Sequence, residues 1–123
     1  MKTSLLIASV LALGGATMAQ AADLNGNWAR SDGKARVKIA KCGGDICATN
    51  TWIKPGTPSE KTGDVLVMKI EKVAENQYSG SAFDPQRDRS YNIKLDVAEN
   101  KMTTTGCILG GLLCKGVGWT RIN

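Results

Sequence analysis

Tyr91-Asn92-Ile93-Lys94-Leu95-Asp96-Val97 alternates between apolar and polar side chains without a break. A period of two is typical of a β-strand with one face in the protein core and the other in water. Residues 34–39, Lys-Ala-Arg-Val-Lys-Ile, repeat the pattern with three apolar residues on one face and three cations on the other. No segment beyond residue 22 keeps a helical spacing of apolar residues, so we expect an all-β chain.

Turn signals separate the runs of this kind. Asp32-Gly33 is a strong signal for a two-residue hairpin, and further breaks fall at 43–45, 75–76, 84–85, 99–100 and 110–111. Residues 54–63, from Lys54 to Gly63, form the one long loop. Eight short strands are predicted between these breaks: Asn27–Ser31, Ala35–Cys42, Ile46–Ile53, Val65–Val73, Tyr78–Phe83, Tyr91–Val97, Met102–Cys107 and Cys114–Ile122.

Eight strands joined by hairpins form an antiparallel up-and-down meander. Closure into a small barrel is the surest way to remove the exposed strand edges, and we expect that architecture. A sandwich or a half-open sheet of the same strands stays open at this point. A barrel embedded in a membrane is not expected, because aromatic residues make up only 5% of the chain and most strands are short.

The first 21 residues have the pattern of a secretory leader. Lys2 supplies the positive charge, residues 5–8 and 10–13 are apolar, and Ala19-Gln20-Ala21 has the small-x-small pattern that signal peptidase cleaves. The apolar stretch is far shorter than the roughly 20 residues that span a bilayer. We therefore predict a cleaved signal peptide over 1–21 and a single β-barrel domain over 22–123. The mature chain is expected in the periplasm or outside the cell.

Four cysteines, Cys42, Cys47, Cys107 and Cys114, follow the predicted cleavage site. An even number in an exported chain favours disulfides over free thiols, with three pairings open. The turn-rich centre of each neighbouring pair favours Cys42–Cys47 and Cys107–Cys114. The chain has no histidine and no Cys-x-x-Cys motif, so we expect neither a metal site nor a redox role.

Residues suited to catalysis are scarce in this sequence. Histidine is absent and the cysteines are expected in disulfides, which removes the commonest bases and nucleophiles. The carboxylates of Asp84, Asp88 and Asp96, with Arg87 and Arg89 nearby, are interpreted as a charged turn and a solvated strand face. The glycines lie at hairpins and lack the strand-to-helix setting of a phosphate loop. We expect no enzyme and no cofactor.

The formal net charge is +5 at pH 7, and Lys34, Arg36, Lys38 and Lys41 form a basic stripe on the second strand. The first interpretation is a solvated outer face that also protects the strand from mispairing. The alternative is a surface for a protein partner or for an anionic partner such as a lipid headgroup or an acidic polymer. Nucleic acid is not expected as a partner of an exported protein.

Large side chains on inward-facing positions are the candidates for a ligand site. Trp52, Met68, Tyr78 and Tyr91 are predicted to reach the barrel interior, where core packing explains them equally well. The sequence thus predicts an exported binding protein for a small, partly apolar ligand, held beneath the loop over 54–63. The alternative is an envelope interaction protein that binds through its outer basic face.

Two family resemblances accompany these patterns. Gly26-Asn27-Trp28 and Trp119-Thr120-Arg121 look like the lipocalin arrangement, which implies that Trp28 packs near Arg121 and closes the barrel floor with Gly26 as a structural residue. A wider pattern resembles the bacterial family called domain of unknown function 2147 over nearly all of the mature chain. That resemblance implies a small exported lipocalin-like barrel. The residues that carry it are Cys42-Gly43-Gly44-Asp45-Ile46-Cys47, Trp52, Asp84-Pro85, Tyr91, Gly106-Cys107, Leu113-Cys114 and Trp119-Thr120-Arg121.

Overall fold

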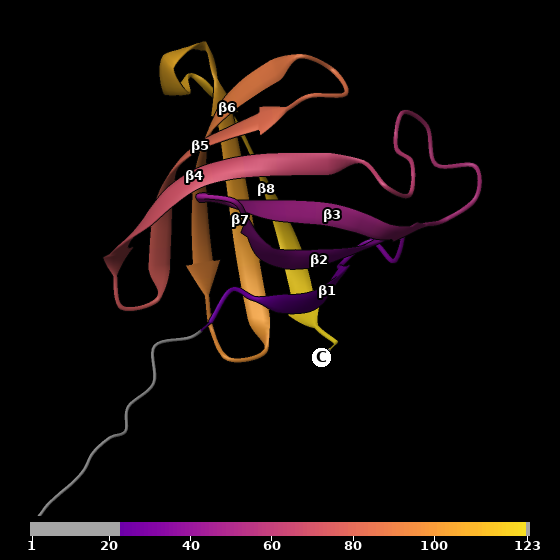
Figure 1. Ribbon diagram of the computed structural model, residues 1–123, viewed down its shortest axis with the longest axis horizontal. Helices are drawn as coiled ribbons and strands as arrows, with labels where there is room; N and C mark the ends of the chain where they lie inside the picture. Colours follow the sequence, from indigo (N-terminus) through magenta and orange to yellow (C-terminus); the bar gives the residue numbers. More distant parts are fainter. Residues whose placement is uncertain (1–22, 123) are drawn as a thin grey trace, which may run out of the picture.

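The computed structural model describes residues 23–122, which form one closed antiparallel β-barrel of eight strands (Figure 1). The strands are β1 (Gly26–Arg30), β2 (Ala35–Cys42), β3 (Asp45–Ile53), β4 (Val65–Ala74), β5 (Gln77–Asp84), β6 (Arg89–Val97), β7 (Lys101–Ile108) and β8 (Leu113–Arg121). Their bounds differ by at most two residues from the predicted ones. The predicted signal peptide and its cleavage site lie outside the described residues.

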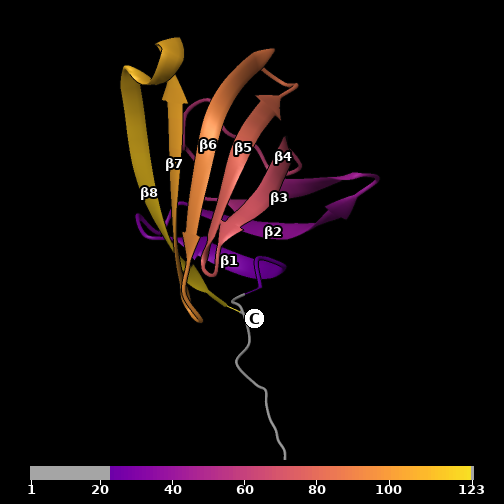
Figure 2. The same ribbon diagram turned by 90° about the vertical axis from the view of Figure 1, so that its left-hand side faces the viewer.

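Closure of the barrel comes from the pairing of the first and last strands. Every strand pairs with its neighbour in the chain, and β8 returns to pair with β1, where Trp28 lies opposite Arg121 and Arg30 opposite Trp119. The strands wrap round a common interior in both views of the ribbon (Figure 2). The predicted up-and-down barrel is confirmed, and the sandwich and the half-open sheet are wrong.

The alternation of side chains builds the core as the sequence predicts. On β2, Ala35, Val37 and Ile39 are buried, whereas Arg36 and Lys38 between them are exposed. On β6, Ile93, Leu95 and Val97 are likewise buried, and the inward-facing Tyr91 is half-buried. The core cluster consists of Leu24, Trp28, Val37, Ile39, Met68, Ala82, Ile93, Leu95, Val97 and Met102.

A β-bulge in β3 reverses the alternation near the end of that strand. Arg36 lies opposite Trp52, but the next residue of β2, Val37, lies opposite Asn50, which leaves Thr51 as the extra residue. Asn50 therefore faces the interior, and Trp52 faces outward with 37% of its surface exposed. The guanidinium of Arg36 lies 5.2 Å from the centre of the Trp52 ring. The prediction that Trp52 reaches the interior is wrong, because one extra residue exchanges the two faces of a strand.

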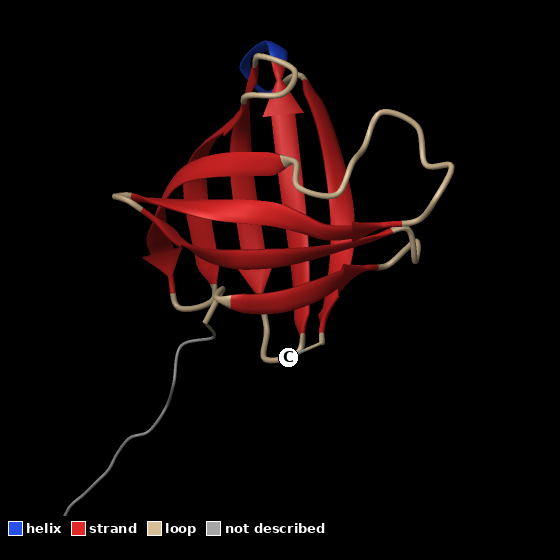
Figure 3. Cartoon of the chain, turned by 45° about the vertical axis from the view of Figure 1, so that its right-hand side comes forward, coloured by secondary structure: helices blue, strands red, loops and turns tan. Residues whose placement is uncertain are grey.

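Both disulfides lie at hairpin turns, one at each end of the barrel. Cys42 is joined to Cys47 across the β2–β3 turn, and Cys107 is joined to Cys114 across the β7–β8 turn. This is the favoured one of the three possible pairings. The β7–β8 connection contains a short 3-10 turn, η2 (Leu109–Gly111), where the sequence predicted a simple turn (Figure 3). Among residues 23–122 no helix has the length and apolar character needed to cross a bilayer.

Candidate functional site

One end of the barrel is closed by a tryptophan, an arginine and the segment that precedes β1. Trp28 is fully buried, and its indole Nε1 donates a hydrogen bond of 2.9 Å to the carbonyl oxygen of Leu24. The guanidinium carbon of Arg121 lies 4.3 Å from the centre of the Trp28 ring. Arg121 also donates to the carbonyl oxygens of Glu99, Asn25 and Asp23. These contacts tie both ends of the described chain together beneath the core.

Gly26 belongs to the same closed end. It starts β1 in the left-handed region, with φ of 136°, and pairs with Ile39 of β2. An L-residue rarely adopts such a φ, so glycine suits the bend that leads the chain from the floor into the first strand. The structure thus brings Gly26, Trp28 and Arg121 together at the floor.

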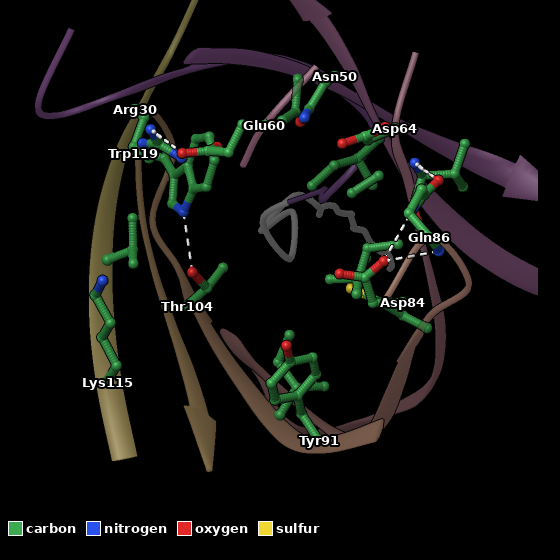
Figure 4. Close-up of a pocket in the computed structure, with 18 of the residues that line it drawn as sticks. Arg30, Asn50, Glu60, Asp64, Asp84, Gln86, Tyr91, Thr104, Lys115 and Trp119 are labelled. Carbon is green, nitrogen blue, oxygen red and sulfur yellow. Dashed lines mark hydrogen bonds and ion pairs between the residues drawn. The ribbon is translucent and has the colours of Figure 1, made fainter. Parts of the chain in front are cut away.

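The other end of the barrel holds a cavity of about 530 Å³. Its wall is apolar and consists of the first residue of β4, Val65, and of inward-facing strand residues, namely Val37, Ile39, Ala48, Leu66, Met68, Ile93, Leu95, Met102 and Val117. Its rim is polar and comes from the strand ends and from the loops at this end, with Arg30, Asn50, Ser59, Glu60, Asp64, Asp84, Gln86, Arg87 and Lys115. Figure 4 shows the labelled polar side chains around an open space, with Arg30 and Glu60 across from Asp84 and Gln86.

An ion pair fastens the long β3–β4 loop over one side of the mouth. Nη1 of Arg30 lies 2.7 Å from Oε1 of Glu60, and Nη2 donates a second bond of 3.1 Å to Oε2. Nε of Arg30 also donates to Asp32 in the β1–β2 turn. The hydrogen bond to Glu60 is the main reason why the pKa of Arg30 lies above its ordinary value. Because Arg30 is the last residue of β1, the barrel itself positions this loop.

A second polar cluster forms the opposite side of the rim, at the end of β5. The carboxylate of Asp84, 8% exposed, accepts bonds from Nη1 of Arg87 at 2.8 Å and from Nε2 of Gln86 at 2.6 Å. The Gln86 side chain also bonds both backbone groups of Val65 and so extends the sheet at the start of β4. Arg87 reaches Asp64 at 3.6 Å.

The cluster determines the charge state of Asp84. Burial alone raises the pKa of the carboxyl, but the hydrogen bonds from Arg87 and Gln86 outweigh burial, and the pKa lies below its ordinary value. The carboxylate is therefore ionised at neutral pH and fully engaged with its neighbours. An ionised carboxylate with its acceptors occupied holds the rim in place and is poorly suited to transfer protons.

Tyr91 and Trp119 add aromatic surface with polar atoms to the cavity wall. Tyr91 comes from β6, and its hydroxyl points toward the open space in Figure 4. Nε1 of Trp119 donates a bond of 3.0 Å to Oγ1 of Thr104 across the β7–β8 pair. This bond leaves the indole face against the cavity. The wall thus offers apolar contact over most of its area and a few polar groups near its mouth.

The four predicted ligand residues fall in three different places. Met68 and Tyr91 line the cavity. Tyr78 lies opposite Leu95, on the inward face of β5, where it packs against the core cluster and does not line the cavity. Trp52 lies outside the barrel. The structure therefore assembles only two of the four in one site.

Other residues that line the cavity are not among the four predicted ligand residues. Asp84 was interpreted as part of a solvated turn, yet its carboxylate is buried at the rim. Lys115, Val117 and Trp119 share the inward face of β8, and the period-two alternation along that strand is the signal that could have identified them. Within residues 23–122 no cluster of cysteine, aspartate and glutamate side chains can hold a metal ion.

Comparisons with known proteins match the chain to a family model and to one solved β-barrel. The family model described as "Uncharacterized protein conserved in bacteria (DUF2147)" matches residues 26–121. A solved structure of a redesigned β-barrel is similar to this chain, with a TM-score of 0.54 and 16% sequence identity. That similarity covers 88% of this chain and 99% of the other, and at such low identity it supports the fold alone. No curated protein matches the chain.

Proposed function

The chain belongs to the bacterial family of uncharacterized proteins DUF2147, and for it we propose a binding function, in which the barrel cavity holds a small amphipathic molecule. The observation that carries the proposal is a cavity of about 530 Å³ with an apolar wall and a polar rim at its open end. Small-molecule sites typically measure roughly 300–1,000 Å³ and combine apolar walls with a few polar groups. The protein performs no catalysis in this proposal.

The charges of the rim indicate which polar group the ligand carries. Arg30 is paired with Glu60, and Arg87 is paired with Asp84. Lys115 lines the same cavity and makes no ion pair within the described part of the chain. A ligand with an anionic head group near Lys115 and an apolar part against the wall matches both the polar rim and the apolar wall of the cavity.

Titration with anilinonaphthalene sulfonate, an apolar anion whose fluorescence rises in dry sites, tests this proposal. Ala48 faces the cavity, so Ala48→Leu fills part of it and should weaken binding of the dye. Ala29 lies on β1 between the inward-facing Trp28 and Arg30, so Ala29→Leu makes the same change on the outer face and serves as the control. Equal affinity of both variants would rule out the cavity as the binding site.

A second pair of variants uses the corrected position of Trp52. Tyr91→Ala should weaken dye binding because Tyr91 lines the cavity, whereas Trp52→Ala should leave it unchanged because Trp52 faces outward. Circular dichroism and thermal unfolding establish that both variants are folded. Loss of binding in Trp52→Ala alone would place the site on the outer surface.

We also propose that the protein is exported and works in the periplasm. Two disulfides in hairpin turns and the leader-like residues 1–21 support this location, since disulfides persist in oxidising compartments. Mass spectrometry of the protein purified from the periplasm should give a chain that begins at Ala22 and has four oxidised cysteines. The same native spectrum reveals a co-purified ligand as added mass. An unprocessed chain found only in the cytoplasm would overturn the proposal of export.

A second candidate function uses the outside of β2. Arg36 and Lys38 on β2 and Lys34 in the preceding turn are exposed on the outer side. Lys41 is also exposed, but it lies opposite Ile46 on the same side of β2 as Val37 and Ile39 and does not belong to this face. In this alternative the basic face binds another envelope protein or an anionic surface. Replacement of Lys34, Arg36 and Lys38 by Gln should then abolish that association and its salt dependence, while dye binding in the cavity stays intact.

A further inference from the structure

The turn that joins β7 to β8 displays an unusual amount of apolar surface. Four large aliphatic residues within 108–113 are exposed, and we call them the apolar tip: Ile108 (36%), Leu109 (65%), Leu112 (82%) and Leu113 (56%). They are half of the eight exposed large hydrophobic residues in the described chain. Single exposed apolar residues are ordinary, but a contiguous group of them marks a contact surface.

The backbone holds the apolar tip in one shape. The disulfide Cys107–Cys114 joins residues that lie directly opposite each other at the base of the turn. Leu109 has φ of +55°, in the left-handed region that a leucine rarely occupies, and Leu112 donates a 3.2 Å bond to its carbonyl oxygen. Burial in the core does not offset the backbone strain at Leu109, because its side chain is exposed. The conformation of this turn therefore exposes the side chains of the apolar tip to solvent.

The apolar tip lies at the open end of the barrel. Lys115 and Val117 line the cavity, and the next inward-facing residue along β8 is Leu113, which pairs with Ile108. The inner face of this hairpin thus continues the cavity wall beyond the rim. Figures 2 and 3 show the turn standing at one extremity of the molecule.

Two cationic side chains lie near the apolar tip at the open end of the barrel. Lys115 lies two residues from Leu113, and Arg89 starts β6, the strand next to β7. Neither makes an ion pair among residues 23–122, whereas Asp88 is the one carboxylate in the β5–β6 turn outside the buried Asp84 cluster. A solvent-exposed apolar group with adjoining unpaired cations matches the interface of an anionic phospholipid bilayer, where apolar side chains enter the acyl region and cations meet headgroup phosphates.

We propose that the apolar tip docks the protein peripherally on an anionic phospholipid bilayer, with the cavity mouth toward the membrane. A second copy of the chain fits this surface less well. Stable protein interfaces bury roughly 1,200–2,000 Å² with complementary shapes, and a convex turn of six residues provides neither. A bilayer requires no complementary shape. The inference goes beyond ligand binding, because docking does not depend on whether the cavity is filled.

Flotation with vesicles made of equal parts phosphatidylcholine and phosphatidylglycerol tests the proposal. The protein used is that purified from the cell, with its N-terminus read by mass spectrometry, because residues 5–8 and 10–13 are themselves apolar. The wild-type protein should float with these vesicles and bind pure phosphatidylcholine more weakly. The double variant Leu109→Asn/Leu112→Ser should lose roughly tenfold or more in partitioning. Asparagine tolerates the left-handed conformation, so this variant should stay folded.

The opposite end of the barrel provides the matched control. Val73 is 57% exposed near the end of β4, on the closed side of the barrel, and Val73→Ser replaces one exposed apolar side chain there by a polar one. Its partitioning should equal that of the wild type. Arg89→Gln should reduce binding to the anionic vesicles and leave binding to phosphatidylcholine unchanged. Trp introduced by Leu112→Trp should be quenched by brominated lipid, whereas Trp introduced by Val73→Trp should not.

Three outcomes would overturn the proposal. The first is a wild-type protein that does not float with the anionic vesicles. The second is an equal loss of partitioning in Val73→Ser and in the double variant. The third is a lipid-free dimer that the double variant dissociates while no vesicle binding is found, which would assign the apolar tip to a second copy. None of these outcomes bears on dye binding in the cavity, so failure of docking is distinguishable from failure of the proposed function.

Discussion

Arg121 shows how one side chain can join the two ends of a chain. It stacks on the buried ring of Trp28 and donates to three backbone carbonyl oxygens from the N-terminal segment and the β6–β7 turn. The planar guanidinium can satisfy several acceptors while its face stays on the indole, which an ammonium cannot do. The floor of the barrel therefore depends strongly on this residue.

Arg121→Gln should lower the free energy of unfolding by about 2–3 kcal/mol, from the lost stacking and the lost bonds to carbonyl oxygens. Arg36→Gln is the matched control, since Arg36 also lies over a tryptophan, Trp52, but on the outer surface. Its cost should stay within about 0.5 kcal/mol. Urea denaturation at neutral pH measures both values, and similar costs would show that Arg121 does not hold the floor.

Asp84 predicts how the stability of the barrel depends on pH. Its pKa in the folded protein is lowered, so the unfolded chain binds more protons than the folded one as the pH falls. The stabilisation is complete above the unfolded pKa of about 4 and is lost as the pH falls through the folded pKa. Asp84→Asn should therefore show a flatter decline of unfolding free energy below pH of about 4 than the wild type. Parallel declines in urea series at several pH values would contradict this assignment.

At the scale of the elements, two local irregularities shape the barrel. The bulge at Thr51 turns Trp52 outward, whereas Asn50, which precedes it, continues the inward alternation of Ala48 and lines the cavity. On β5, Gly80 lies opposite Ile70 of β4, and a Cβ at Gly80 would clash with the carbonyl oxygen of Lys69. The close approach of these two strands requires a residue with no side chain at this position.

Gly80→Ala should therefore destabilise the protein by about 1–3 kcal/mol, because the backbone of β4 has to move away from the new methyl group. Gly116→Ala is the control, as a strand glycine whose added Cβ would have its nearest neighbour at an ordinary 3.9 Å, the Oγ1 of Thr105. That variant should be neutral or slightly stabilising. Thermal unfolding followed by circular dichroism compares the two, and an unchanged Tm in Gly80→Ala would show that the strands separate freely.

At the scale of the whole molecule, the barrel has one closed end and one open end with different chemistry. The closed end holds the Trp28–Arg121 stack, and the open end holds the cavity, the ion-paired loops and the apolar tip. Ligand and membrane therefore meet the same end of the protein in our proposals. The strands that connect the two ends supply the buried core.

A ligand in the cavity should stabilise the whole fold by mass action. At a free concentration about a hundredfold above its Kd, anilinonaphthalene sulfonate should add about 2.7 kcal/mol and raise the Tm by on the order of 10 °C. Trp52→Ala should keep this increase and Tyr91→Ala should reduce it. Differential scanning calorimetry avoids interference from dye fluorescence. A dye that lowers the Tm would instead bind the unfolded chain.

The sequence correctly predicted the positions of the strands but only some of the residues that line the cavity. The alternation in β2 and β6 assigned inward and outward residues correctly, and the turn signals located all eight strands. Met68 and Tyr91 were identified as lining residues because their own strands alternate regularly. Trp52 was misassigned because a bulge leaves no local mark in the sequence. Asp84 was missed because its burial depends on Gln86, Arg87 and the start of β4 folding around it.

The sequence by itself determined the all-β class, the strand order and the disulfide-bearing hairpins, because alternation and turn preference are properties of residues close together in the chain. The tertiary structure decided where the cavity lies, which aromatic residues face it, and that the apolar tip stands beside its mouth. These features depend on the register between paired strands and on closure of β8 against β1. A shift of one residue in that register moves the inward-facing side chains of a strand to the outer surface. The register is determined only when the strands pair in the assembled barrel.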